Sequence, residues 1–430
     1  MAAHALDYDA GVLPVDLVSP HAARVDVALD GVIEAVLGVP INTVVRDQLQ
    51  LPTDMAGLQF QRISSILPLA RLAAVIETGP MVREKLATWL PEGADTSAHD
   101  SGLDAQPGID ALALDGFALG PHGRPVLSQE PVSHDPARPR APLRHTLNAL
   151  LRASSQSRFS RIFEGADLRS KARLYSASGP SAGKSFVASL SMDGIGYSDA
   201  QWRAALQWRL GIEERPAPGS RCQFVCSGTS DEGCCGTLLG AHADHEVICP
   251  TGPLVVARHG EICELVGGFH AETGAVVRRE ALVPEFHKNS IDAFLDVWAF
   301  GVPEISDLLL DVTVRHPGAV SYVERAAQTP GFCCAEASRD KHNRYPPTGG
   351  RHAVCFAVET WGRLGPEAEA VLVHAAGVAA HRDSLHSRSA SGRLQRWRSQ
   401  LDAALHRAVA NAILYGHAGL PGRSLHRLRE

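Results

Sequence analysis

Two aspartates stand inside apolar segments of strand length in the second half of the chain. Asp296 lies in residues 295–302 and Asp311 in residues 308–314. A carboxylate within an apolar strand is costly unless it is paired or binds a metal. On adjacent strands of one sheet, the two carboxylates could face each other and hold a hard divalent cation through oxygen ligands.

Lys341 follows in a segment with helical character, and Tyr345 comes one turn later on the same expected face. Two carboxylates for a metal and a lysine beside them are the groups needed to hydrolyse a phosphodiester. The alternative is that each aspartate ends a strand, caps a turn or lies on a solvated face, because charged side chains are usually exposed.

The motifs FLDV, LLDVTVRHP, KHNRYP and FAVETWGRLGPEA resemble the restriction-like endonuclease region of non-LTR retrotransposon polyproteins. The resemblance covers most of residues 172–415 and is most specific over 295–365. It implies a PD-(D/E)xK-type fold, a small mixed sheet flanked by helices. It assigns Asp296 and Asp311 to Mg²⁺ or Mn²⁺, Lys341 and Tyr345 to the family's helical lysine and tyrosine, and Glu280 to the glutamate of the preceding helix.

The sequence departs from this family at two positions. Thr313 stands where the general nuclease pattern has a lysine, a residue that the retrotransposon branch moves to the helix. Ser338 stands three positions before Lys341, where that branch usually has another charged residue. The second departure favours a weakened or inactive nuclease.

A second group of chemically active residues precedes the nuclease-like region. His245 and Cys249 have the spacing of two ligands on one helical turn, and Cys235 is followed by a glycine. Either Cys222 or Cys226 could complete a Cys/Cys/His/Cys set, which suits tetrahedral Zn²⁺. The alternatives are buried free cysteines beside a surface histidine, or substitution of a ligand by the neighbouring His242 or Cys234.

The resembling family has a zinc knuckle at the corresponding place. The knuckle is followed there by an Arg-His pair, which matches Arg258 and His259 in this chain. The resemblance therefore implies structural Zn²⁺ next to a catalytic divalent cation.

Composition places broad limits on function. The chain has 430 residues, 45% of them hydrophobic and 20% charged, which predicts a mostly globular protein of two to four domains. Its net charge of −6 counts mildly against a dedicated nucleic-acid binder. Neither a signal peptide nor an apolar run of membrane-spanning length is evident, so we expect a nuclear or cytoplasmic protein without a membrane.

The predicted fold class is mixed α+β, in six parts. Helices are expected at residues 27–37, 63–76, 198–210 and 259–266 and after Pro366. The parts are a helical connector (1–91), a flexible linker (92–145), a helical segment (146–215), the zinc knuckle (216–258), the nuclease core (259–365) and C-terminal helices with an arginine-rich tail (366–430). The connector resembles the stretch that follows the polymerase in the same family.

Two further motifs bear on nucleic-acid and nucleotide binding. The nine arginines after residue 381 could lie along a phosphate backbone, or could simply form a solvated helix face. Residues 179–185, GPSAGKS, have three residues between the glycines, whereas a phosphate-binding loop needs four. A nucleotide site is therefore not expected.

The sequence favours a metal-dependent DNA endonuclease that nicks its target, within a retrotransposon reverse transcriptase-like protein. The pair of adjacent aspartates that a polymerase palm needs is missing, so a reverse transcriptase would be supplied separately. DNA is the expected partner, with RNA as an alternative. The rival interpretations are a non-catalytic zinc-containing nucleic-acid-binding module and an inactive relic.

Overall fold

The chain forms two compact units in the computed structural model. The first comprises residues 1–52 and 59–165, and the second comprises residues 53–58 and 166–430. The structure describes residues 15–89, 107, 109–111, 143–189, 192–213, 219–224, 235–251, 253–287, 292–303, 305–383 and 389–418. Most of the expected linker lies outside these ranges.

The first unit is helical in the described residues. Its main helices are α2 (Val15–Leu37), α3 (Thr43–Gln50), α4 (Ile63–Trp89) and α7 (Leu143–Glu164). Apolar side chains at helical spacing form its core, in which Leu67, Leu72 and Leu150 are buried. The helices expected at 27–37 and 63–76 are both present.

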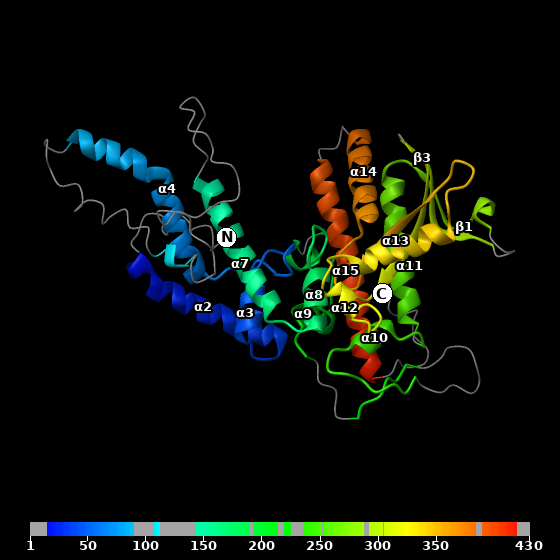
Figure 1. The fold of residues 1–430 in the computed structure, drawn as a ribbon, viewed down its shortest axis with the longest axis horizontal. Helices are drawn as coiled ribbons and strands as arrows, with labels where there is room; N and C mark the ends of the chain where they lie inside the picture. The colour runs from blue at the N-terminus through cyan, green and yellow to red at the C-terminus, as the bar shows by residue number, and fades with distance from the viewer. Residues whose placement is uncertain are drawn as a thin grey trace. The chain divides into compact units, whose positions relative to one another are not determined.

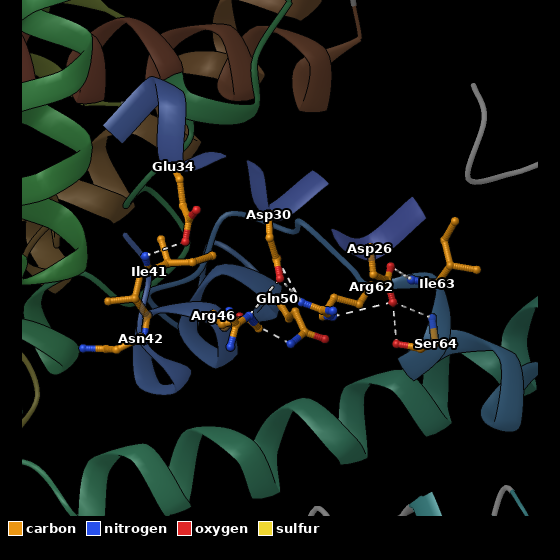
Figure 2. Close-up of polar contacts among 11 residues, drawn as sticks. Asp26, Asp30, Glu34, Ile41, Asn42, Arg46, Gln50, Arg62, Ile63 and Ser64 are labelled. Carbon is orange, nitrogen blue, oxygen red and sulfur yellow. Dashed lines mark hydrogen bonds and ion pairs between the residues drawn. The ribbon is translucent and has the colours of Figure 1, made fainter. Parts of the chain in front are cut away.

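Two aspartates of α2 hold the start of α4 (Figure 2). The buried carboxylate of Asp26 accepts hydrogen bonds from the backbone N–H of Ile63 at 2.8 Å and of Ser64 at 3.1 Å. A carboxylate at a helix N-terminus satisfies orphan donors and opposes the positive end of the dipole. Asp30 pairs with Arg62 at 2.6 Å and with Arg46 of α3 at 3.0 Å. These ion pairs join α3 to α2 and to the start of α4.

The second unit contains helices and one sheet. Its elements in chain order are α8 (Leu168–Ser176), η3 (Ser185–Val187), α9 (Asp199–Leu210), α10 (Asp244–Ile248), α11 (Leu254–Glu272), β1 (Val276–Leu282), η4 (Pro284–Phe286), β2 (Phe294–Val302), β3 (Ser306–Arg315), α12 (Val323–Ala326), α13 (Phe332–Arg344), β4 (Ala353–Glu359), α14 (Pro366–Arg382) and α15 (Ala390–Ala418). The two strands expected from apolar runs correspond to β2 and β3.

Helix α9 has a capping residue at each end. Ser198 and Gln201 form a reciprocal capping box at its start, and Gly211 ends it with a left-handed φ of 70°. The expected boundary at residue 258 is not a boundary in the structure, because residue 258 lies inside the continuous helix α11.

The sheet has four strands in the order β1-β2-β3-β4. The first three are antiparallel neighbours, and β4 runs parallel to β3. A parallel neighbour requires a crossover, which α12 and α13 supply. The described part of the chain therefore holds a mixed sheet, as expected.

Helices cover both faces of this sheet (Figure 1). On one face α11, α14 and α15 bury the main core, which includes Ile262, Val266, Val297, Leu310, Phe356, Leu372 and Trp397. On the other face α13 packs its Cys334 and Ala337 against Cys355 and Ala357 of β4. The central strands therefore present side chains to α11 on one side and to α13 on the other.

The GPSAGKS loop binds a carboxylate of the protein itself. The backbone N–H groups of Gly183 and Ser185 donate to Asp402 of α15 at 2.8 and 2.9 Å. The Lys184 ammonium donates to the hydroxyl of Thr53 at 2.9 Å. The loop is thus a turn whose backbone N–H groups bind an internal carboxylate.

Candidate functional site

Four metal-ligand side chains meet beside α15. The donor atoms of Cys222, Cys235, His245 and Cys249 all lie within 4.8 Å of one another. The Sγ atoms of Cys222 and Cys249 are 3.7 Å apart, and Cys235 Sγ is 3.3 Å from His245 Nε2. Tetrahedral Zn²⁺ with thiolate and imidazole ligands spaces its donors roughly 3.3–3.8 Å apart, so this set fits the ion.

Two short segments and one helix present these donors. Residues 221–224 run antiparallel to residues 235–238, with Cys222 N–H donating to Thr237 O at 2.8 Å. Helix α10 carries His245 and leads directly into Cys249. The group packs on Ala412 of α15. Cys222 therefore takes the fourth position among the described residues, whereas Cys226 and Cys234 lie outside them and His242 is not part of the set.

The thiols of this cluster differ in acidity. The hydrogen bond to Thr237 lowers the pKa of Cys235 to about 6, whereas burial raises the pKa of Cys222 to about 12. Buried thiols crowded together without a disulfide are stabilised as thiolates once a cation binds them.

Asp296 and Asp311 lie where the sheet divides. The pairing of β2 with β3 ends at Val297 and Leu310, while β2 continues along β1 and β3 continues along β4. The two aspartates are the next residues on each strand at the opening, and their carboxyl groups are within hydrogen-bonding reach of each other. The Asp296 carboxylate accepts the N–H of Val312 at 2.6 Å, in place of a backbone partner on β2.

The two carboxyl groups are close enough to influence each other's ionisation. Burial raises the pKa of Asp311 above its ordinary value, and the hydrogen bond with Asp296 adds to this against the opposing charge of Lys341. Burial also opposes ionisation of Asp296, but His259 and the Val312 N–H outweigh it and hold its pKa below the usual range. Two carboxyls that share a site in this way disfavour each other's ionisation, and a divalent cation could relieve this through its oxygen ligands.

Lys341 and Tyr345 reach the same opening from the end of α13. The Lys341 ammonium lies 2.8 and 2.9 Å from the two oxygens of Asp311. Tyr345 is the C-terminal cap of α13 rather than a residue within it, and its ring packs on Phe286. Burial raises the pKa of the Tyr345 phenol, and the charge of Asp311 adds to this. Both residues that were expected beside the aspartates are therefore there.

Glu280 lies in a strand, not in the preceding helix. Helix α11 ends at Glu272, and Glu280 is an exposed residue of β1 with a left-handed φ of 47°. The β1–β2 pairs on either side place it across from Asp296. The expectation of a helical glutamate was wrong because the VVRREAL segment forms the edge strand β1 of the sheet. Glu280 nevertheless remains one strand away from the aspartates.

Two residues near the opening were not identified from the sequence as site residues. His259 of α11 approaches Asp296, with Nε2 3.3 Å from its carboxylate, and Cys263 lies one turn further along α11. A His-x-x-x-Cys spacing on one helix face is the signal that could have revealed them. The hydrogen bond to Asp296, aided by Cys263, raises the pKa of His259 to about 10.

Ser338 occupies the position where a second charged residue was expected. Its hydroxyl bonds the thiol of Cys355, the β4 residue paired with Asp311. Glu367 of α14 approaches from the same side and accepts the Cys355 N–H at 3.0 Å. The carboxylate of Glu367 from α14 therefore lies near Ser338, the α13 position at which a charged residue was expected.

Several arginines of the C-terminal helix bind acidic groups of the protein. Arg393 and Arg396 both bind Glu272 at 2.5 Å, and Arg407 binds Glu261 at 2.8 Å. Arg398 likewise pairs with a glutamate of α14. The expectation that these arginines lie along a phosphate backbone is not supported, because their charge is used to hold α15 against α11 and α14. The last arginines, beyond residue 418, lie outside the described residues.

A scan against protein-family models and a search of curated proteins each found no match for this chain. None of the helices in the described residues is long and apolar enough to cross a membrane. What the chain does must therefore be inferred from the geometry of its two clusters.

Proposed function

We propose that the chain is a metal-dependent endonuclease of the restriction-like type that nicks DNA and carries a structural zinc knuckle. The observation that supports this most is the meeting of Asp296, Asp311 and Lys341 at the opening between β2 and β3. Paired carboxylates with an adjacent ammonium combine a cation site with a group that binds a phosphate.

Each side chain has a role in this proposal. Asp296 and Asp311 would hold Mg²⁺ or Mn²⁺ through carboxylate oxygens, and a cation bound there would supply Lewis-acid stabilisation of the phosphate and a more acidic water. Lys341 is held by Asp311 now and would turn toward a phosphate oxygen when a cation takes that carboxylate. Tyr345 lines the same opening, and Glu280 would assist from β1.

The zinc knuckle would serve as a rigid attachment rather than as a reaction centre. Arg258 of α11 donates to the carbonyl of Val247 in α10 at 3.0 Å, and His316 after β3 lies 3.0 Å from Asp244 at the start of α10. These contacts join the Cys/His cluster to the sheet-bearing core. Four protein ligands with no open position are typical of structural zinc.

A non-catalytic nucleic-acid-binding module is the second candidate. The uncharged Ser338 favours this candidate, because the resembling nucleases usually have a charged residue there. The Lys341–Asp311 ion pair is compatible with it, because an active site that has lost its activity could keep this ion pair. Two observations count against tight DNA binding by either candidate. The net charge is −6, and the α15 arginines pair with acidic groups of the protein itself.

Plasmid relaxation tests the proposal. The purified chain should convert supercoiled DNA to the open circle in Mg²⁺ or Mn²⁺, and a chelator should stop the conversion. DNA binding that falls with rising salt, without any cleavage in either metal, would favour the binding module instead.

A further inference from the structure

We infer that the chain has a second transition-metal site, formed by His259, Cys263 and Asp296 on the α11 side of the sheet. Donor atoms of these three residues all lie within 4.8 Å of one another. This site is separate from the Cys222 cluster, and its mixed nitrogen, sulfur and oxygen donors suit Zn²⁺ or Co²⁺ better than Mg²⁺.

The distances match the ligands of a single ion. His259 Nε2 is 3.3 Å from Asp296 Oδ2 and 3.7 Å from Cys263 Sγ. Tetrahedral coordination by nitrogen, oxygen and thiolate sulfur gives ligand separations of roughly 3.3–3.6 Å. His259 and Cys263 are four residues apart on α11, which places both on one helix face.

The Nε2 nitrogen of His259 faces more acceptors than its one proton can serve. Besides Asp296 and Cys263, Nε2 is 3.1 Å from the carbonyl oxygen of Val312. Nε2 carries at most one proton, whether or not Nδ1, which is also 3.7 Å from Cys263 Sγ, is protonated, and it directs that proton at one acceptor. A cation between the imidazole, the thiol and the carboxylate would instead satisfy all three side chains at once.

The partial exposure of two of its three ligands leaves this site open to solvent. Cys263 is fully buried in the main core, whereas the His259 side chain is 39% exposed and that of Asp296 is 20% exposed. Three protein ligands with one side open to solvent leave a coordination position for water or a small anion. The site shares Asp296 with the cation position of the proposed function, but it is inferred from this donor geometry and does not require that the chain cleaves DNA.

Cobalt absorption tests this site directly. Protein given one equivalent of Zn²⁺, which the four-ligand Cys222 cluster should take before the three-ligand site, should bind one further Co²⁺ and develop thiolate-to-cobalt charge-transfer absorption. Cys263→Ala should abolish that absorption, and His259→Gln should weaken Co²⁺ binding at least about tenfold. The matched controls are Cys333→Ala, which changes another buried cysteine, and His342→Gln, which changes a half-exposed histidine of α13. Both controls should keep the cobalt absorption.

Two outcomes would overturn the inference. One is that zinc-filled parent protein shows no cobalt–thiolate absorption, and the other is that the absorption survives in Cys263→Ala. If Cys263→Ala does not fold, the partly exposed His259→Gln variant still decides the matter, since unchanged Co²⁺ affinity there excludes the site. A parent that shows the cobalt absorption yet never cleaves DNA would support this site while contradicting the endonuclease proposal.

Discussion

The ammonium of Lys341 lies 2.8 and 2.9 Å from the two carboxylate oxygens of Asp311, although 30 residues separate them in the chain. The lysine comes from a helix and the aspartate from a central strand, so the pair depends on how α13 packs on the sheet. The Asp311 side chain is 6% exposed, and that of Lys341 is 20% exposed. The lysine is therefore the partner with room to turn toward a substrate.

Lys341→Ala should slow DNA nicking by about 100-fold while leaving divalent-cation binding in place. The reason is that the proposed role of the ammonium is on the phosphate, whereas the carboxylates hold the cation. Single-turnover nicking rates and Mn²⁺ titrations would measure the two effects. Arg339→Ala is the matched control, because Arg339 is an exposed cation of the same helix that pairs with Glu336. Equal loss of rate in both variants would contradict the assignment.

Cys222→Ser should reduce bound zinc from about one equivalent to much less, and should lower the melting temperature. Cys226→Ser should leave both unchanged, because Cys222 already completes the four-donor set. Metal analysis by mass spectrometry and a thermal melt with and without a chelator would show this. Retention of zinc in Cys222→Ser with loss in Cys226→Ser would reverse the ligand assignment.

Asp402→Asn should destabilise the second unit by about 3 kcal/mol near neutral pH, because it removes a buried charge that accepts from two backbone N–H groups of the 183–185 loop. Burial opposes ionisation of Asp402, yet the charge and hydrogen bond of His406 together with the other donors keep its pKa below the ordinary value. A lowered carboxylate pKa stabilises the fold above the unfolded pKa of about 4 and ceases to do so as the pH falls through the folded value.

The difference in stability between parent and Asp402→Asn should therefore shrink as the pH is lowered below about 4. Urea unfolding across this pH range would measure it. Glu264→Gln is the control, because the Glu264 side chain is 81% exposed and its ion pair should contribute little at any pH. A pH-independent difference would show that the charge of Asp402 is not the source of its effect.

Glu280→Gly should raise stability by roughly 0.5–1 kcal/mol, because a left-handed φ is unfavourable for glutamate and free for glycine. The same change should lower nicking if Glu280 assists the cation site from β1. Glu280→Gln separates the two effects, since it keeps the backbone strain and removes the charge. Lower stability in Glu280→Gly would mean that the side chain makes contacts that outweigh the strain.

The parts of this fold that were predictable are those that local sequence determines. Apolar runs predicted β2 and β3, and the helix expected at 198–210 is α9, which its Ser198 capping box and Gly211 delimit. The Cys/His spacing predicted the cluster of four metal-ligand side chains, because His245 and Cys249 were expected on one helical turn. Cys222 was left open against Cys226, since spacing alone does not show which thiol the chain brings back to the ion.

What could not be predicted depends on packing between distant segments. Asp402 lies 219 residues from Gly183, and no periodicity links a helix acid to that loop. His259 joins Asp296 only because α11 crosses the sheet where β2 and β3 separate. The strand at Glu280 was missed because the helical position came from the family resemblance, and the mixed charged and apolar residues of VVRREAL gave no clear strand pattern against it.

The rate of plasmid nicking by the parent chain and by Asp311→Asn, in Mg²⁺ and in Mn²⁺, tests the central proposal most directly. Asparagine keeps the shape of the side chain but removes the charge that would hold the cation. The parent should nick in at least one metal, and Asp311→Asn should not nick in either while keeping its zinc and its melting temperature within a few degrees. A parent that binds DNA without nicking it, or an Asp311→Asn variant that nicks as fast as the parent, would contradict the proposal.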